Sequence, residues 1–73
     1  MTETQLLADY HAAAYWHVRF LIEAQPALAA SRKREMLHLE QALRWHYHYT
    51  PDALDCLFEA AAQAVERPYG QGG

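Results

Sequence analysis

Hydrophobic and polar positions follow the period of an α-helix along most of the chain. In three stretches, at about residues 3–25, 32–48 and 51–67, apolar side chains recur three, four and seven positions apart. This spacing places them on one face of a helix, whereas a half-buried strand would need strict alternation. The pattern therefore predicts an all-α protein with three helices.

The expected first helix is bounded by a capping motif and a proline. Thr2 and Gln5 have the spacing of a capping box, in which each side chain bonds the backbone N–H of the other residue. Pro26 disfavours helical backbone at the residue before it. We therefore expect residues 26–31 to form a connector, with Ser31 as the N-cap of the second helix.

A second boundary follows at Thr50, a favoured N-cap residue, and Pro51, which suits the first position of a helix. Because this link is so short, the second and third helices are expected to be neighbours. Pro68 ends the third helix. The expected fold is a small three-helix bundle or a bent helical hairpin, with residues 1–67 as a single domain and residues 68–73 as a flexible tail.

The apolar surface of the helices exceeds what one small core is expected to cover. The chain has 73 residues, of which 52% are hydrophobic, and domains of this size often bury the remainder by association. Four bulky apolar side chains fall outside the core-facing stripes: Trp16, Phe20, Ile22 and Trp45. Exposed aromatic side chains are typical anchors of protein interfaces. We therefore expect a C2 homodimer that binds a partner protein through these residues.

A run of three cations forms the other expected contact surface. Arg32, Lys33 and Arg34 fall in the first turn of the expected second helix, where positive charge opposes the helix dipole. The preferred interpretation is a solvated helix start whose charge is balanced by Glu35 or, in a bundle, by Glu23 and Glu66 at the neighbouring helix ends. The alternative is that this locally unfavourable arrangement steers the protein toward an acidic partner surface.

A weaker alternative assigns the same cations to nucleic-acid binding, with aromatic side chains as stacking groups. The candidates for stacking are Trp45, Tyr47 and Tyr49. They lie at the opposite end of the helix from residues 32–34, roughly 20 Å away at 1.5 Å per residue. The net charge of −3 is also unfavourable for binding a polyanion.

The stretch RWHYHYT at residues 44–50 raises the question of a metal site. His46 and His48 are two positions apart and therefore diverge on a helix. Chelation by one helix needs a spacing of three or four. The preferred interpretation is an aromatic helix end that packs partly inward.

His17 and His46 are nevertheless expected on the buried faces of their helices. The preferred interpretation is that both are hydrogen-bonded core histidines. The alternative is a zinc or nickel site built across helices from His17 and His46, with His11 or His38 completing the ligand set. A metal-binding protein is therefore the main alternative to a protein-interaction module.

The sequence contains no recognisable catalytic constellation. Cys56 is the only cysteine, and it lies toward an acidic helix edge that does not favour a reactive thiolate. The first residues lack the basic and apolar segments of a signal peptide, and no apolar run approaches the roughly 20 residues that span a bilayer. The prediction is a non-enzymatic, cofactor-free cytoplasmic protein: a regulator, adaptor or inhibitor of a partner protein, such as a bacterial or phage accessory protein.

Overall fold

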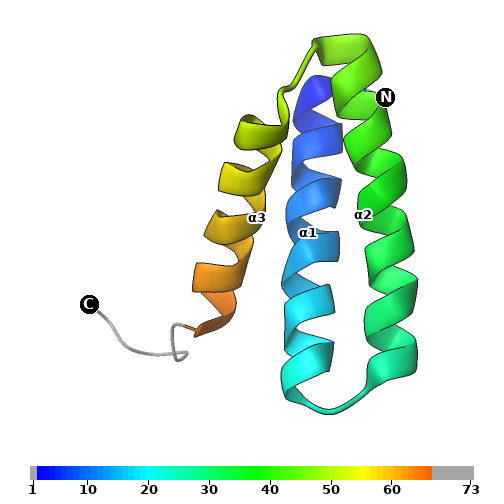
Figure 1. Cartoon of the computed structure of the whole chain (residues 1–73), viewed down its shortest axis with the longest axis vertical. Coiled ribbons are helices and arrows are strands. Elements are labelled where there is room, and N and C mark those ends of the chain that lie inside the picture. The colour runs from blue at the N-terminus through cyan, green and yellow to red at the C-terminus, as the bar shows by residue number, and fades with distance from the viewer. Residues whose placement is uncertain (1, 67–73) are drawn as a thin grey trace.

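The computed structural model describes residues 2–66 and folds them into three α-helices (Figure 1). The helices are α1 (Glu3–Ile22), α2 (Pro26–Tyr47) and α3 (Pro51–Glu66), and the described residues contain no strand. The all-α prediction is therefore confirmed. Arg67, the expected last residue of the third helix, and the expected tail at residues 68–73 lie outside the described residues.

Two of the three predicted N-terminal caps, at Thr2 and Thr50, are present. At the start of α1, the Gln5 backbone N–H donates to Thr2 Oγ1 at 3.2 Å, and the Thr2 N–H donates to Gln5 Oε1 at 3.0 Å. At the start of α3, the Ala53 N–H donates to Thr50 Oγ1 at 3.1 Å. These bonds satisfy N–H groups that have no partner inside the helix, so they fix where α1 and α3 begin.

The second helix begins earlier than predicted. α2 starts at Pro26, so residues 26–31 are helical rather than a connector, and Ser31 lies inside the helix instead of capping it. The fixed φ of proline suits the first position of a helix, and the alanines that follow favour helical backbone. The proline that separates the first two helices is therefore itself the start of α2.

The turn between α1 and α2 comprises residues 23–25. Ala24 has a φ of 59°, in the left-handed region, and the Gln25 N–H donates to the Phe20 carbonyl oxygen at 2.8 Å. This reversal ends α1 at Ile22 rather than at the predicted residue 25. It directs α2 back along α1, so that the two form an antiparallel hairpin (Figure 1).

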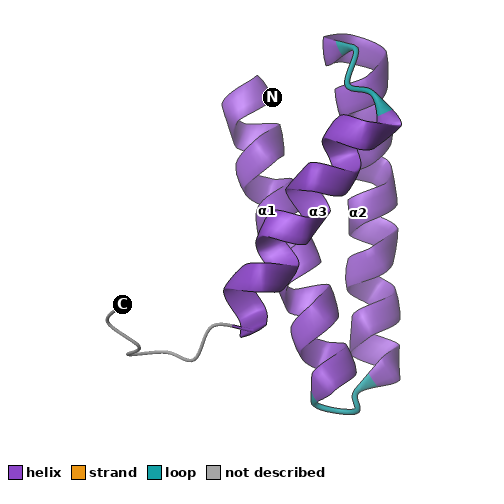
Figure 2. Cartoon of the chain, turned by 60° about the vertical axis from the view of Figure 1, so that its left-hand side comes forward, coloured by secondary structure: helices purple, strands orange, loops and turns teal. Residues whose placement is uncertain are grey.

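α1 is the helix on which the other two pack. It contacts α2 extensively and α3 to a lesser extent, whereas α2 and α3 contact each other little (Figures 1 and 2). The expectation that the second and third helices pack together is therefore wrong. At the end of α2, His48 has a left-handed φ of 58°, and this change of direction sends α3 onto α1 instead.

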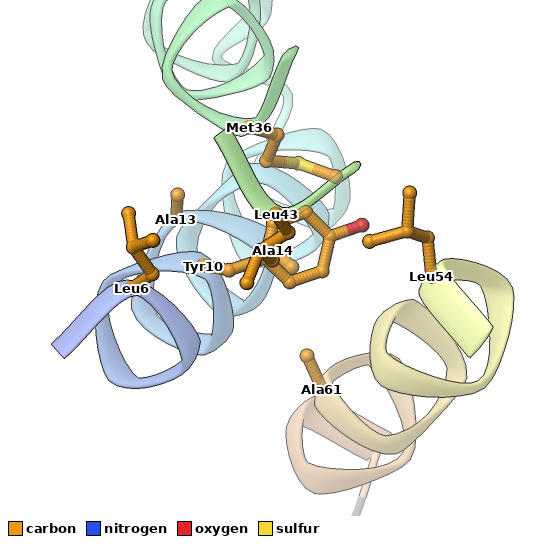
Figure 3. Close-up of a cluster of buried hydrophobic side chains, with 8 residues drawn as sticks. All are labelled: Leu6, Tyr10, Ala13, Ala14, Met36, Leu43, Leu54 and Ala61. Carbon is orange, nitrogen blue, oxygen red and sulfur yellow. The ribbon is translucent and has the colours of Figure 1, made fainter. Parts of the chain in front are cut away.

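The buried core lies where the three helices meet (Figure 3). Its members are Leu6, Tyr10, Ala13, Ala14, Met36, Leu43, Leu54 and Ala61. Tyr10 and Leu43 are the largest fully buried side chains. The alanines beside them allow the helices to approach closely around these two residues.

The Tyr10 ring brings a polar group into this core. Its hydroxyl donates to Glu40 Oε2 at 2.9 Å and so links α1 to α2. Burial, and then the bond to the Glu40 carboxylate, raises the pKa of Tyr10 above its ordinary value. The buried hydroxyl is therefore both satisfied and held in its neutral form.

Candidate protein-interaction surfaces

The four predicted apolar anchors do not form one surface. Trp16 and Phe20 are four residues apart on α1 and share a face. Ile22, which is 66% exposed, is six residues from Trp16 and points about 120° away from it around the helix. Trp45 lies near the far end of α2, which is the end remote from the α1–α2 turn. The structure therefore separates these residues into distinct sites.

Trp16 is held in a cluster of aromatic and charged side chains on α1. Its ring lies 5.5 Å from that of Phe20 and 5.4 Å from that of Tyr15, between centroids, and the Arg19 guanidinium lies 5.7 Å from the Trp16 ring centroid. Arg19 also donates to Tyr15 Oη and to Glu23 Oε2, each at 3.0 Å. Although supported in this way, Trp16 remains 39% exposed. It therefore presents a prearranged ring to solvent.

Two separate open hollows lie where α1 meets α2, and each is lined by residues of both helices. One of about 300 Å³ is lined by Asp9, Ala12, Arg32, Glu35, His38 and Leu39. The other, of about 590 Å³, is lined by Leu6, Ala42, His46 and Tyr47. Because positions 35, 39, 42 and 46 are spaced by three or four residues, both hollows follow one face of α2. We call this feature the seam groove.

Trp16 lies on α1 beyond the residues that line the seam groove, on the side toward the α1–α2 turn. It follows Ala12 by four residues and Asp9 by seven, so it continues the α1 edge of the first hollow. Phe20 extends the same edge by one more turn of helix. Beyond one end of the seam groove therefore stands the exposed Trp16 ring, with the half-buried Phe20 beside it, and the larger hollow lies at the other end.

The second exposed tryptophan belongs to a separate site, where α2 gives way to α3. Trp45 is 80% exposed, the most exposed of the large hydrophobic residues in the described part of the chain. It borders a hollow of about 380 Å³ whose lining residues are Arg44, Trp45, His48, Tyr49, Thr50 and Pro51. We call this site the Trp45 corner.

Backbone bonds and one side-chain bond fix the shape of the Trp45 corner. His48, in its left-handed conformation, is followed by Tyr49, whose N–H donates to the Leu43 carbonyl oxygen at 3.2 Å. The Tyr49 hydroxyl donates to Glu3 Oε2 at 2.7 Å and so ties the corner to the start of α1. This bond raises the pKa of Tyr49. The corner is therefore a shaped surface in which the Trp45 ring itself is left largely uncovered.

The three predicted cations do not form one basic patch. Because α2 begins at Pro26, Arg32, Lys33 and Arg34 lie beyond its first turn, and the predicted conflict with the helix dipole is wrong. Consecutive residues point about 100° apart on a helix, so the three side chains diverge. Arg32 lines the first hollow and pairs with Glu35 at 3.3 Å, in agreement with the preferred interpretation of a charge balanced by Glu35.

The two histidines predicted to face the core differ in their surroundings. His17 is half-buried, and its Nδ1 lies 2.8 Å from the Ala29 carbonyl oxygen, to which it donates. His46 is exposed, contrary to the prediction, because α3 covers the other side of the hairpin. Ala29 and His46 are 17 residues apart on α2, about 25 Å. Within one chain, His17 and His46 therefore do not converge, and His11 and His38 are both exposed.

Sequence reasoning identified Trp45 but missed the corner around it. The aromatic run at residues 44–50 was expected to form a helix end, and α2 does end there, at Tyr47, but the left-handed His48 that redirects the chain was not foreseen. The signal for the end of α2 was present in Thr50 and Pro51. They require α2 to end before them, which places the aromatic residues at a bend.

Among residues 2–66, no group of three or more His, Cys, Asp or Glu side chains is placed to hold a metal ion. Within the same residues, no helix combines the length and the apolar character needed to cross a membrane. Comparison of the chain with protein-family models, with curated proteins and with solved structures found no match.

Proposed function

We propose that this protein is a non-catalytic protein-interaction module of the cytoplasm that acts as a homodimer and docks onto a partner protein through the Trp45 corner. The observation that carries the proposal is the 80% exposure of Trp45 beside a hollow of about 380 Å³. A tryptophan buries about 150–250 Å² in an interface. At about 25 cal/mol per Å² this is worth roughly 4–6 kcal/mol before the costs of association.

The lining of the Trp45 corner favours an acidic partner surface. Arg44 contributes a full positive charge, while no carboxylate lines the hollow. Within residues 2–66, Arg44 makes no ion pair with the chain's own carboxylates. An acidic segment with an apolar side chain beside it would complement both Arg44 and Trp45. In this proposal, the module regulates, inhibits or recruits the protein that binds at the Trp45 corner.

The test is capture and affinity measurement with matched tryptophan variants. Wild-type protein and Trp45→Ala are used to capture proteins from extract, and a candidate partner is then purified and titrated calorimetrically. We expect Trp45→Ala to raise the Kd per subunit at least about thirtyfold, as for an interface hot spot, while Arg44→Gln weakens the salt dependence. Trp16→Ala is the control, because it alters an exposed tryptophan outside the corner and is expected to leave the Kd per subunit unchanged. A partner that binds Trp45→Ala as tightly as wild type would contradict the proposal.

A further inference from the structure

We propose that the seam groove is the self-association surface, in which Trp16 and Phe20 of each copy occupy the hollow lined by Leu6, Ala42, His46 and Tyr47 of the other copy. The proposal rests on the homodimer part of the proposed function and specifies its geometry. It assigns Trp16 to the dimer and leaves Trp45 for the partner protein.

The first argument is the self-complementary shape of the groove. The projecting Trp16 and the hollow at Leu6 lie ten residues apart on α1, about 15 Å along its axis. A twofold axis that crosses the groove midway between them exchanges the two ends, so each copy offers a projection where the other offers a hollow. This is the arrangement that a C2 interface requires, in which residue i contacts j and j contacts i. The volume of about 590 Å³ is sufficient to receive aromatic side chains.

The second argument is the chemistry at the middle of the groove, where the axis would pass. Ala12 lines the central hollow, and Ala42 lines the end hollow. Because alanine side chains are small, neither residue prevents the second copy from approaching closely. Arg32 and Glu35 lie at the centre as an ion pair of 3.3 Å. Because the strip carries both signs, a second copy does not meet a surface of one repelling charge, and reciprocal Arg32–Glu35 contacts between copies are available.

The third argument is the position of α3. α3 packs on one side of the α1–α2 hairpin (Figure 2). The residues that line the two hollows of the seam groove all belong to α1 and α2, so α3 contributes nothing to this surface. A second hairpin placed there brings two helices from each copy together as a four-helix arrangement. The exposed Trp16 side chain would then leave water.

The dimer is tested by sedimentation equilibrium of the purified chain across a concentration series. We expect the wild type to be dimeric and Trp16→Ala to raise the dimer Kd at least about thirtyfold. Ala42→Arg places a large side chain in the hollow that receives Trp16 and Phe20 of the other copy. It should therefore raise the dimer Kd by a comparable factor. Trp45→Ala is the matched control, since it removes a more exposed tryptophan outside the groove and should leave the dimer Kd unchanged. Circular dichroism of each variant establishes that the helices are retained.

A cross-linking measurement tests the geometry without weakening the interface. Ala12→Cys in a Cys56→Ser background places the only thiol near the proposed twofold axis, so a short bis-maleimide should join two copies. The wild type supplies the control, because its single exposed thiol is Cys56 on α3, away from the groove. We expect efficient cross-linking of the first protein and little of the second.

Three outcomes would overturn the proposal: a monomeric wild type, a dimer that survives both Trp16→Ala and Ala42→Arg, or no cross-linking through Cys at position 12. Any of these leaves docking at the Trp45 corner to be judged by its own titration. Conversely, a Trp16-dependent dimer with no Trp45-dependent partner would support the self-association surface and contradict the docking function.

Discussion

The two helices that pack against α1 are attached to it in different ways. α2 lies along α1 as an antiparallel hairpin, buries Leu43 completely, and is joined to α1 by the Tyr10–Glu40 and His17–Ala29 hydrogen bonds. α3 is shorter, and its buried residues are Leu54 and Ala61. Within residues 2–66, no side-chain hydrogen bond joins α3 itself to either neighbour.

This difference indicates that the hairpin is the framework and that α3 acts as a cover on one side of it. Segments with few buried contacts open more readily than the core to which they are attached. The α1–α2 hairpin has two faces, and α3 packs against one of them. The seam groove lies on a face that α3 does not line. On the proposed model, the second copy covers the other.

The largest expected loss of stability comes from truncating a buried leucine on α2 or on α3. Leu43→Ala should cost about 2–5 kcal/mol, out of a total of about 4–11 kcal/mol for a 73-residue chain. Leu54→Ala should cost less and act mainly on α3, because Leu54 packs where fewer contacts are made. Urea unfolding in the Trp16→Ala background, which removes the contribution of the dimer, gives the two values.

Amide hydrogen exchange sharpens the same comparison. In Leu54→Ala, the α3 amides should lose protection while those of α1 and α2 keep most of theirs. In Leu43→Ala, protection should fall in all three helices together. Equal losses from the two substitutions, or uniform exchange in both, would mean that α3 belongs to the framework after all.

A smaller effect is expected from Tyr10→Phe, which removes one polar link between α1 and α2. Losing the bond to Glu40 should cost about 0.5–1.5 kcal/mol at neutral pH. The pKa of Tyr10 is raised in the fold, so its contribution is complete below the ordinary tyrosine pKa of 10.0 and is lost as the pH rises above that value. Stability measured from pH 8 to 11 should therefore fall less steeply in Tyr10→Phe than in wild type.

The matched control for that measurement is Tyr49→Phe. The Tyr49 hydroxyl bonds Glu3 at an exposed position and links the Trp45 corner to α1 rather than α1 to α2. The pKa of Tyr49 is raised chiefly by that bond, so the alkaline slope should change in the same direction but less than for Tyr10→Phe. A larger change from Tyr49→Phe would show that the corner, not the core, controls the alkaline transition.

The smallest expected effects are gains of stability at the two bends that end α1 and α2. Ala24 and His48 have φ values of 59° and 58°, which glycine adopts without the steric cost paid by other residues. Ala24→Gly and His48→Gly should each stabilise the fold by up to about 1 kcal/mol. Ala30→Gly, the same change inside α2, should instead destabilise it by about 0.5–1 kcal/mol. A loss of stability in Ala24→Gly would contradict the assigned turn.

Prediction from the sequence succeeded where neighbouring residues decide the outcome. The capping box at Thr2 and the cap at Thr50 are local hydrogen bonds, and both are present. Pro26 was recognised as a boundary but assigned to the wrong element, because a proline disfavours helix before it and favours helix after it. The end of α2 was expected within one residue of its position, but the left-handed turn at His48 was not, because Thr50 and Pro51 indicate that a helix ends before them and not how the chain bends.

The candidate surfaces were predictable only in part. Periodicity identified Trp16 and Trp45 as residues outside the core stripes, and both are exposed. It predicted that His46 faces the core, whereas His46 is exposed in the structure. It also grouped Arg32 with Lys33 and Arg34, although consecutive side chains on a helix point in different directions. Whether Trp16 and Trp45 share one surface was beyond its reach, because periodicity describes one helix at a time, and the structure places them in different sites.

The sequence by itself determined that the chain forms three helices and which stripe of each is apolar, because helical period and capping act within a few residues. Tertiary structure alone decided that α3 packs on α1, that the seam groove stays open, and that the two tryptophans belong to different sites. The reason is that a side chain is buried only if another helix covers its face. That depends on how each turn directs the following helix.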